Sequence, residues 1–216
     1  MVMTRWKNNF LGTILFLLSL SLFCSIAPAR GIAKTGSNLL EQVLSLQLGM
    51  DKYLIGNVLT YDQKAKGGTR LVDGAYEGTY KLSDGDLFVV VDQKSDRVLA
   101  LYKQIMDADK QQLRTMIADL MDRFAAPTTL AHDKILYWAF NKYGVISEED
   151  YNKAKDIKQL PELGIIATVK LSSAIEIIPD SSDAGKEKED AGLSHGTIYF
   201  IITSEPLVKQ FLNNQG

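Results

Sequence analysis

The chain has 216 residues, enough for one ordinary domain or two very small ones, and its 46% hydrophobic and 23% charged residues are typical of a globular protein. Lys and Arg number 24 against 26 Asp and Glu, which argues against a dedicated nucleic-acid binder because such a protein needs a surplus of cations. One Cys excludes a disulfide framework and a Cys-rich metal site, and two His leave little for a zinc enzyme.

Residues 1–29 have the three parts of a secretory signal peptide. Arg5 and Lys7 form a cationic start, an uncharged and mostly apolar stretch follows, and Ala-Pro-Ala at 27–29 offers small residues where a signal peptidase reads. We expect cleavage after Ala29 and a secreted, periplasmic mature chain. The alternative is an uncleaved N-terminal membrane anchor, because the apolar stretch approaches the length that spans a bilayer.

Cys24 is not expected to carry a lipid, because Phe23 precedes it where a bacterial lipoprotein signal has a small side chain. If Cys24 leaves with the signal peptide, the mature chain has no thiol, which suits an oxidising compartment. No second apolar stretch is long enough to cross a membrane, so we expect that the mature chain does not span one.

The N-terminal half of the mature chain predicts one helix and then an antiparallel meander. Residues 37–49 have apolar residues on one helical face, with Ser37 as a cap and Gly49 as the end. Alternating and continuous apolar runs, separated by turns too short for a crossover, predict strands. The strands are expected at 53–61, 76–82, 87–92 and 98–102, with a loop at 63–74.

The C-terminal half contains the clearest element, an amphipathic helix at 109–124 that we expect to cover the sheet. Residues 134–141 favour a strand, with a helix as the alternative, because six apolar and largely aromatic residues follow one another. Further elements are expected as a short helix at 148–157, strands at 164–178 and 197–202, a mobile polar loop at 180–196, and a terminal helix beginning at 204–206.

These elements predict an α+β fold, in which an antiparallel sheet packs against an amphipathic helix and is flanked by N- and C-terminal helices. We expect a single domain over 30–216, because neither half has much core of its own. The alternative is a two-part organisation with a boundary near 105–109.

Residues 113–178 resemble the small periplasmic outer-membrane-assembly lipoproteins and β-lactamase-inhibitor-like domains. The resemblance is carried by the helix 113–124, the turn Ala126-Pro127-Thr128-Thr129, and an aromatic segment with Tyr137-Trp138. Ala126 stands where that group has Gly, and the chain has no lipobox cysteine. The resemblance implies a non-enzymatic protein that binds other envelope proteins, and it assigns no functional residue.

The residues offer no matched acid, base and nucleophile, so we expect no catalytic residue, no metal and no cofactor. His132 and His195 are interpreted as exposed turn residues. The five acids within 180–196 are interpreted as a solvated loop, with a calcium site as the alternative, and the basic stretch 64–70 as a hairpin connection, with an anion contact as the alternative.

Aromatic residues give the only candidate ligand site, a pocket between sheet and helix; plain core is the competing interpretation. The candidate ligand-binding residues are Tyr80, Tyr102, Tyr137 and Trp138, chosen from an aromatic set that also includes Tyr76, Phe88 and Phe140. We therefore expect a secreted, non-catalytic binding or envelope-assembly accessory protein whose partner is an envelope protein. The alternatives are a carrier of a small apolar ligand in that pocket and a hydrolase with an unrecognised carboxylate site.

Overall fold

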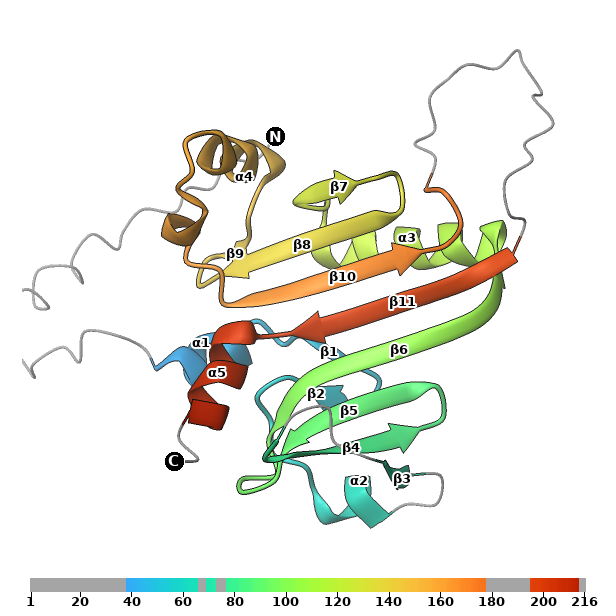
Figure 1. Ribbon diagram of the computed structural model, residues 1–216, viewed down its shortest axis with the longest axis vertical. Helices are drawn as coiled ribbons and strands as arrows, with labels where there is room; N and C mark the ends of the chain where they lie inside the picture. The colour runs from blue at the N-terminus through green and yellow to red at the C-terminus, as the bar shows by residue number, and fades with distance from the viewer. Residues whose placement is uncertain (1–37, 66–68, 73–76, 178–194, 214–216) are drawn as a thin grey trace, which may run out of the picture. The chain divides into compact units, whose positions relative to one another are not determined.

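The computed structural model describes residues 38–65, 69–72, 77–177 and 195–213, which belong to one compact unit (Figure 1). The expected signal peptide, the Ser37 cap, Tyr76 and most of the expected polar loop lie outside the described residues. No helix in these ranges combines the length and hydrophobicity that a bilayer crossing requires.

Runs of antiparallel strands are separated by single helices, which is an α+β arrangement. In chain order they are α1 (Leu39–Ser45), β1 (Gly49–Met50), β2 (Tyr53–Leu54), α2 (Tyr61–Ala65), β3 (Thr69–Val72), β4 (Thr79–Asp84), β5 (Leu87–Asp92), β6 (Val98–Asp109), α3 (Lys110–Phe124), β7 (Thr129–Ala131), β8 (Ile135–Asn141), β9 (Gly144–Val145), α4 (Glu148–Asp156), the 3₁₀ helix η1 (Leu160–Leu163), β10 (Ala167–Ser173), β11 (His195–Thr203) and α5 (Glu205–Asn213).

One antiparallel sheet organises the described residues, in the order β3-β4-β5-β6-β11-β10-β8-β7 with β9 paired to β8 (Figure 1). The meander β4-β5-β6 is confirmed, and β11 joins it to the second group of strands by pairing with β6 over Ala100–Asp109. Residues far apart in the chain therefore share one continuous surface at the centre of the sheet.

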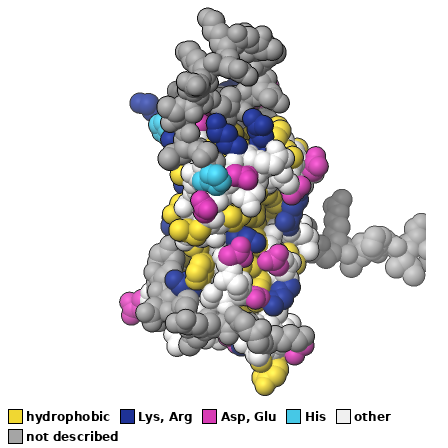
Figure 2. All heavy atoms as spheres, turned by 90° about the vertical axis from the view of Figure 1, so that its right-hand side faces the viewer, with side chains coloured by type: hydrophobic (Ala, Val, Ile, Leu, Met, Phe, Trp, Pro, Cys, Tyr) yellow, Lys and Arg dark blue, Asp and Glu magenta, His cyan; other side chains and the backbone are white. Residues whose placement is uncertain are grey.

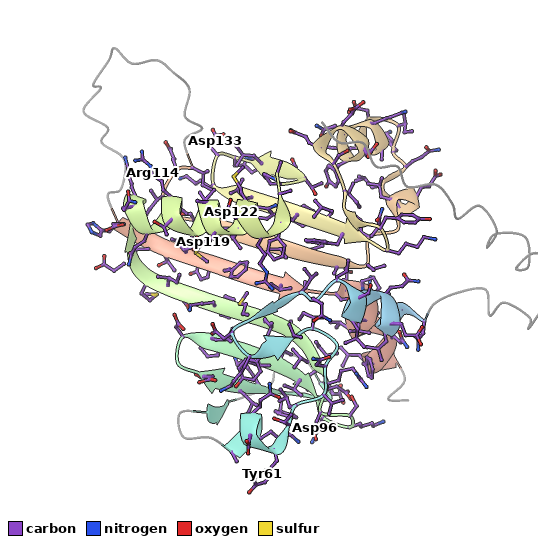
Figure 3. The ribbon with its side chains drawn as sticks, turned by 180° about the vertical axis from the view of Figure 1, so that it is seen from behind. Tyr61, Asp96, Arg114, Asp119, Asp122 and Asp133 are labelled. Atoms are coloured by element: carbon purple, nitrogen blue, oxygen red, sulfur yellow. The ribbon has the colours of Figure 1, made fainter. Side chains whose placement is uncertain are left out.

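Helix α3 covers one face of this sheet, which we call the inner face (Figure 3). It begins at a capping box: the Asp109 carboxylate accepts from the Gln112 backbone N–H, and the Gln112 side-chain oxygen accepts from the Asp109 backbone N–H. Its apolar stripe buries Leu113, Leu120 and Phe124 in the core. The prediction of this helix and of its place on the sheet is confirmed.

Trp138 lies at the centre of the inner face and has no solvent exposure. Its ring lies 6.3 Å from that of Phe124, and its indole N–H donates to the Ala125 carbonyl at 3.0 Å. Ala125 has a φ of +62°, so the chain leaves the helix immediately after Phe124. The strand interpretation of 134–141 is confirmed by β8.

The β1–β2 hairpin covers a second part of the inner face, beside α3 (Figure 3). Tyr53 is fully buried there, and its hydroxyl donates to Asp84 at 2.9 Å while the Lys52 ammonium lies 2.7 Å from the same carboxylate. Glycine is needed at position 49 of β1, because a Cβ there would collide with the Tyr53 carbonyl of the paired strand β2. This hairpin was predicted as part of a longer helix and a longer strand.

Several predicted boundaries are wrong. The first helix ends at Ser45 rather than Gly49, because Gln47 adopts a φ of +50° and the chain turns into β1. The strand expected over 53–61 is limited to Tyr53–Leu54, and Tyr61 begins the short helix α2. Strand β6 continues to Asp109, through the proposed domain boundary, and β11 begins at His195, which was predicted to lie in the loop.

The segment between β8 and β10 forms a separate cover at one end of the sheet. The predicted helix at 148–157 is confirmed as α4, and its Ser147 cap accepts from the Asp150 amide at 3.1 Å. Tyr151 of α4 lies against Tyr137 with ring centroids 6.3 Å apart, so α4 reaches the face opposite to α3. The terminal helix is confirmed as α5, and its first turn is held by Ser204, which is fully buried.

Candidate interaction surface

The face of the sheet opposite to α3, here called the outer face, is turned toward the viewer in Figure 1. Because side chains alternate along a strand, residues that alternate with Trp138, Val169 and Ile202 point outward. Helix α4 covers the β8 end of this face through Tyr151, whereas no described helix crosses β5, β6 or β11 in Figure 1. The described helices therefore leave the central part of the outer face open.

This open part carries an unusual set of side chains for a solvent-facing sheet. The registry places Phe88 opposite Tyr102, Tyr102 opposite Ile201, and Ile201 opposite Lys170. We call the group the aromatic face, and it consists of Lys81, Phe88, Tyr102, Lys170, Tyr199 and Ile201.

Three rings form a continuous stack across β5, β6 and β11. The Phe88 and Tyr102 centroids lie 5.6 Å apart with 26° between the ring planes, and the Tyr102 and Tyr199 centroids lie 6.1 Å apart with 14° between them. Partial burial, and then the neighbouring Tyr199 hydroxyl, raise the pKa of Tyr102 above its usual value. Tyr199 keeps 37% of its surface exposed.

Two lysines are the only charged side chains of the aromatic face. The Lys81 ammonium lies 5.4 Å from the Phe88 ring centroid, a cation–π distance, and neither Lys81 nor Lys170 forms an ion pair with another described residue. Two carboxylates share this strand alternation in the described strands: Asp92 is buried and accepts from Ser95, and Asp109, opposite His195 at the end of β6, accepts from the Gln112 backbone N–H. On the side of the molecule that Figure 2 shows, acidic and basic side chains are intermixed.

A polar chain borders the stack along β6. The Tyr102 hydroxyl donates to the Gln104 side-chain oxygen at 3.1 Å, and the Gln104 amide donates to the Met106 sulfur at 2.8 Å. Met106 is 66% exposed, more than Tyr199, the other exposed large hydrophobic residue on this part of the sheet. A flexible thioether beside fixed aromatic rings suits a surface that adapts to a protein partner.

The inner face contains a second feature, a groove of about 510 Å³ between α3 and the β1–β2 hairpin. Its volume lies within the range of about 300–1,000 Å³ that ligand pockets occupy. Asp119 and Arg123 of α3, Asp51 of the hairpin and Lys103 of β6 border it, and Figure 3 shows Asp119 on α3 above the strands. Its apolar lining is Met50, Ile105, Met116, Leu120, Ile198 and Phe200. The groove is open to solvent rather than closed.

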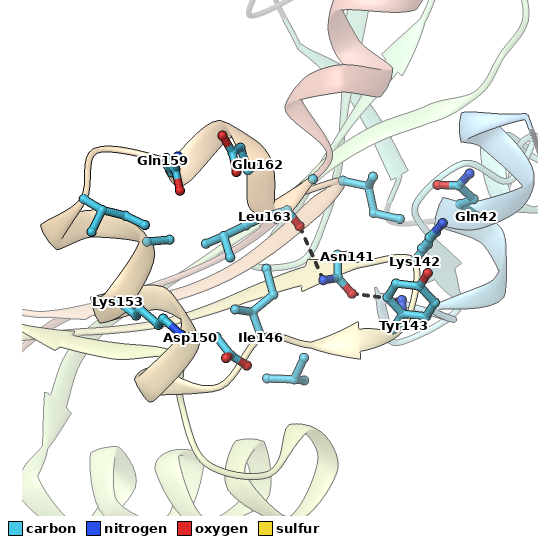
Figure 4. A pocket seen from close by; sticks show the side chains of 15 residues that line it. Gln42, Asn141, Lys142, Tyr143, Ile146, Asp150, Lys153, Gln159, Glu162 and Leu163 are labelled. Carbon is cyan, nitrogen blue, oxygen red and sulfur yellow. Dashed lines mark hydrogen bonds between the residues drawn. The ribbon is translucent and has the colours of Figure 1, made fainter.

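The third feature is a larger groove of about 900 Å³ between α4 and η1 on one side and the β8–β9 turn on the other (Figure 4). Its polar groups are already engaged in part: the Asn141 amide donates to the Leu163 carbonyl, Asn141 accepts from the Tyr143 backbone, and Asp150 accepts from Ser147. Its charged residues, Lys142, Asp150, Lys153 and Glu162, balance one another. No acid, base and nucleophile converge in it in a recognisable catalytic arrangement.

The four candidate ligand-binding residues do not share one pocket. Tyr102 and Tyr137 point to the outer face, whereas Trp138 is core on the inner face. Tyr80 alternates with Leu82 on the inner face, and its hydroxyl donates to Asp96 at 2.6 Å, so burial and this hydrogen bond raise the pKa of Tyr80. Only Tyr102 belongs to the aromatic face.

The other candidate positions have structural roles or lie outside the described residues. His132 and Asp133 form the β7–β8 turn with φ of +54° and +50°, and His195 pairs with Asp109 in β11. Among the described residues no group of three or more His, Cys, Asp and Glu is placed to hold a metal. Lys64 of the basic stretch lies in α2 and pairs with Asp96, while the acids of the expected polar loop, for which a calcium site was the alternative, lie outside the described ranges.

The sequence interpretation assigned Tyr199, Ile201, Lys81 and Lys170 to no site, and it counted Phe88 among the aromatic residues of the expected pocket. Their alternation along strands was a usable signal, because it showed that each strand has two faces, but it did not show which face is covered. Comparison of the chain with protein-family models, with curated proteins and with solved structures finds no match.

Proposed function

We propose that this protein is a non-catalytic binding protein that is secreted by means of residues 1–29 and docks an envelope protein on its aromatic face. One observation carries the proposal: the stack of Phe88, Tyr102 and Tyr199 lies on a sheet face that the described helices leave open, with Tyr199 37% exposed. Aromatic residues are enriched where proteins bind one another, because they bury large areas at little cost in side-chain entropy.

The composition of the face supports a protein partner over a solvated role. A sheet face exposed to water normally carries polar side chains, whereas this one carries three rings and Ile201 between two lysines. Contiguous apolar surface of this kind marks interaction sites in soluble proteins. Secretion and cleavage after Ala29 are part of the same proposal, since they determine that the partner is met outside the cytosol.

The proposal is tested by site-specific photo-cross-linking in cells of the native source. The photoreactive amino acid p-benzoylphenylalanine replaces Tyr199 on the aromatic face and, as matched controls, Tyr61 of α2 and Met121 of α3, which are 82% and 43% exposed. We expect a discrete protein adduct from position 199 and none from the controls. Absence of an adduct at 199, or equal adducts at all three positions, contradicts the proposal. N-terminal sequencing of the same material tests cleavage after Ala29.

A second candidate function is carriage of a small apolar ligand, which the groove between α3 and the β1–β2 hairpin favours. Its buried floor of Ile198 and Phe200 suits an apolar molecule, and its mixed border charges favour one without net charge. Mass spectrometry of small molecules extracted from the purified native protein tests this role. Ile198→Trp fills the groove and should abolish ligand recovery if the groove is the site.

A further inference from the structure

The two lysines of the aromatic face lie on opposite sides of the ring stack. Lys81 belongs to β4 and Lys170 to β10, and the strand order β4-β5-β6-β11-β10 places four strand spacings between them. Because neighbouring strands lie about 4.8 Å apart, the two positions are separated by about 19 Å across the sheet. Phe88, Tyr102 and Ile201 occupy the strands between them.

This spacing matches the width of a helix laid along the strands. A helix with its side chains is about 10–12 Å in diameter, so it covers β5, β6 and β11 and leaves its two flanks facing the lysine side chains. The chain itself uses this arrangement on the inner face, where α3 lays an apolar stripe over the sheet. A helix on the outer face completes a helix–sheet–helix sandwich.

Addition of a strand to the sheet is the less favourable way to dock here. The described sheet ends in β3 and β7, which have four and three residues, so neither edge offers a long ladder of backbone hydrogen bonds. The exposed rings project from the face of the sheet rather than from an edge. The face therefore selects an amphipathic element whose own backbone is already hydrogen-bonded.

The positive charge of the aromatic face favours a partner that carries negative charge. Lys81 and Lys170 have no acidic partner among the described residues, and Asp92 is buried and bonded to Ser95. This face is cationic in a chain whose total charge is −2. Carboxylates on a docked element would meet both ammonium groups, whereas lysines there would be repelled.

We propose that the aromatic face binds an amphipathic helix of a partner protein, whose apolar stripe packs on Phe88, Tyr102, Tyr199 and Ile201 and is flanked on both sides by Asp or Glu. This proposal rests on the proposed function and specifies the chemistry of the partner. The carboxylates on the two flanks pair with Lys81 and Lys170, which fixes the position of the helix between them.

The test uses two synthetic helical peptides of about 18 residues, long enough to be helical, with the same leucine stripe and either Glu or Lys along both flanks. Affinity for the mature protein is measured by fluorescence anisotropy at low and high salt. We expect the Glu peptide to bind at least about tenfold more tightly than the Lys peptide at low salt, with the difference shrinking at high salt. Equal affinity, or no binding of either peptide, overturns the proposal.

Charge reversal locates the effect. The double variant Lys81→Glu/Lys170→Glu should lose about tenfold or more in affinity for the Glu peptide and gain affinity for the Lys peptide. The matched control Lys94→Glu/Lys155→Glu makes the same charge change at exposed positions outside the face and should leave the preference for the Glu peptide intact. The melting temperature of each variant shows that it is folded. An equal response of both double variants contradicts the assignment.

Two outcomes separate this proposal from the proposed function. If Tyr199→Ser abolishes an adduct that the native partner forms with p-benzoylphenylalanine at position 106, but charge reversal does not change peptide binding, the face is a docking site whose partner is not an acidic helix. The second outcome comes from measuring the binding of the protein to vesicles of neutral lipid with about a quarter anionic lipid. If Lys81 and Lys170 are needed for vesicle binding while the Glu peptide does not bind, the face is a membrane contact and the helix proposal is wrong.

Discussion

The two faces of the sheet are built from the same strands and differ in what covers them. On the inner face, Trp138, Val169 and Ile202 share a row of the sheet and have no exposure, because α3 and the β1–β2 hairpin lie over them. On the outer face, the rings of Tyr102 and Tyr199 stack on each other, but both side chains remain partly exposed to solvent. Adjacent residues in β8 illustrate the difference, since Trp138 is core and Tyr137 lies against α4.

Because of this difference, we expect the inner face to determine the stability of the protein and the outer face to determine what it binds. Inner-face side chains are close-packed, so a substitution there leaves a cavity that the structure must tolerate. Outer-face side chains keep contact with water, so a substitution there changes little in the folded state and much in what the face can bind. The following predictions test this separation.

Trp138→Ala should cause the largest loss, about 3–5 kcal/mol of unfolding free energy, because it opens a cavity beneath α3 and removes the hydrogen bond to the Ala125 carbonyl. Urea denaturation followed by circular dichroism measures the loss. Trp138→Phe should recover part of it. A loss below about 1 kcal/mol would mean that the inner face is not the core.

Leu120→Ala should cost about 2–5 kcal/mol, because this residue is 5% exposed and belongs to the stripe with which α3 packs on the sheet. The neighbouring residue Met121 is 43% exposed, so Met121→Ala serves as the matched control and should change stability by less than about 0.5 kcal/mol. Equal losses in the two variants would show that α3 packs differently.

Lowering the pH should remove a smaller contribution to the free energy of unfolding, the one made by the contacts of Asp84 and Asp96. Hydrogen bonds from Lys52 and Tyr53 lower the pKa of Asp84, and those from Lys64 and Tyr80 lower the pKa of Asp96. Since the folded pKa lies below the unfolded value, this stability is present above about pH 4 and is lost as the pH falls through the folded pKa.

The pH dependence of unfolding measures this contribution, which we expect to be about 1 kcal/mol or less for each residue because both side chains are about a third exposed. Asp84→Asn/Asp96→Asn should flatten the pH dependence in the acid range. Asp122→Asn, an exposed change on α3, should keep the wild-type slope. A double variant with the wild-type slope would refute the assignment.

Tyr199→Ala should have a small effect on stability, less than about 1 kcal/mol, the usual size of a cross-strand pair contribution. Its effect on partner binding should be large in comparison. Thermal unfolding and photo-cross-linking from Met106, which is 66% exposed on the same face, measure the two quantities. A stability loss comparable to that of Trp138→Ala would show that the outer face is part of the core.

Elements with a strong local pattern were predictable. Helix α3 combines a capping residue with an apolar stripe, and β5 is a continuous apolar run between two turns; both appear where the sequence indicates. The C-terminal half of β6 was missed, because Met106, Asp107 and Asp109 have no strand pattern of their own. Pairing with β11 holds this segment extended, through a bulge where Asp107 has a φ of +54°.

The candidate site was less predictable than the fold. Of its six residues, only Phe88 and Tyr102 were named from the sequence, and both were assigned to a pocket with Tyr80, Tyr137 and Trp138. The alternation of Tyr137 and Trp138 already implied opposite faces, and this signal was available. The approach of Tyr199 to Tyr102 was not available, since almost a hundred residues of chain separate them and no local pattern encodes their pairing.

The sequence by itself determined the α+β class, the meander, the amphipathic helix and the absence of a cationic surplus, because all of these follow from local periodicity and composition. The tertiary structure decided that β6 and β11 pair, that α3 and the hairpin cover one face, and that three rings and two lysines share the other. Periodicity identifies which side chains share a strand face, but whether a second layer of the protein lies over that face depends on contacts between distant segments.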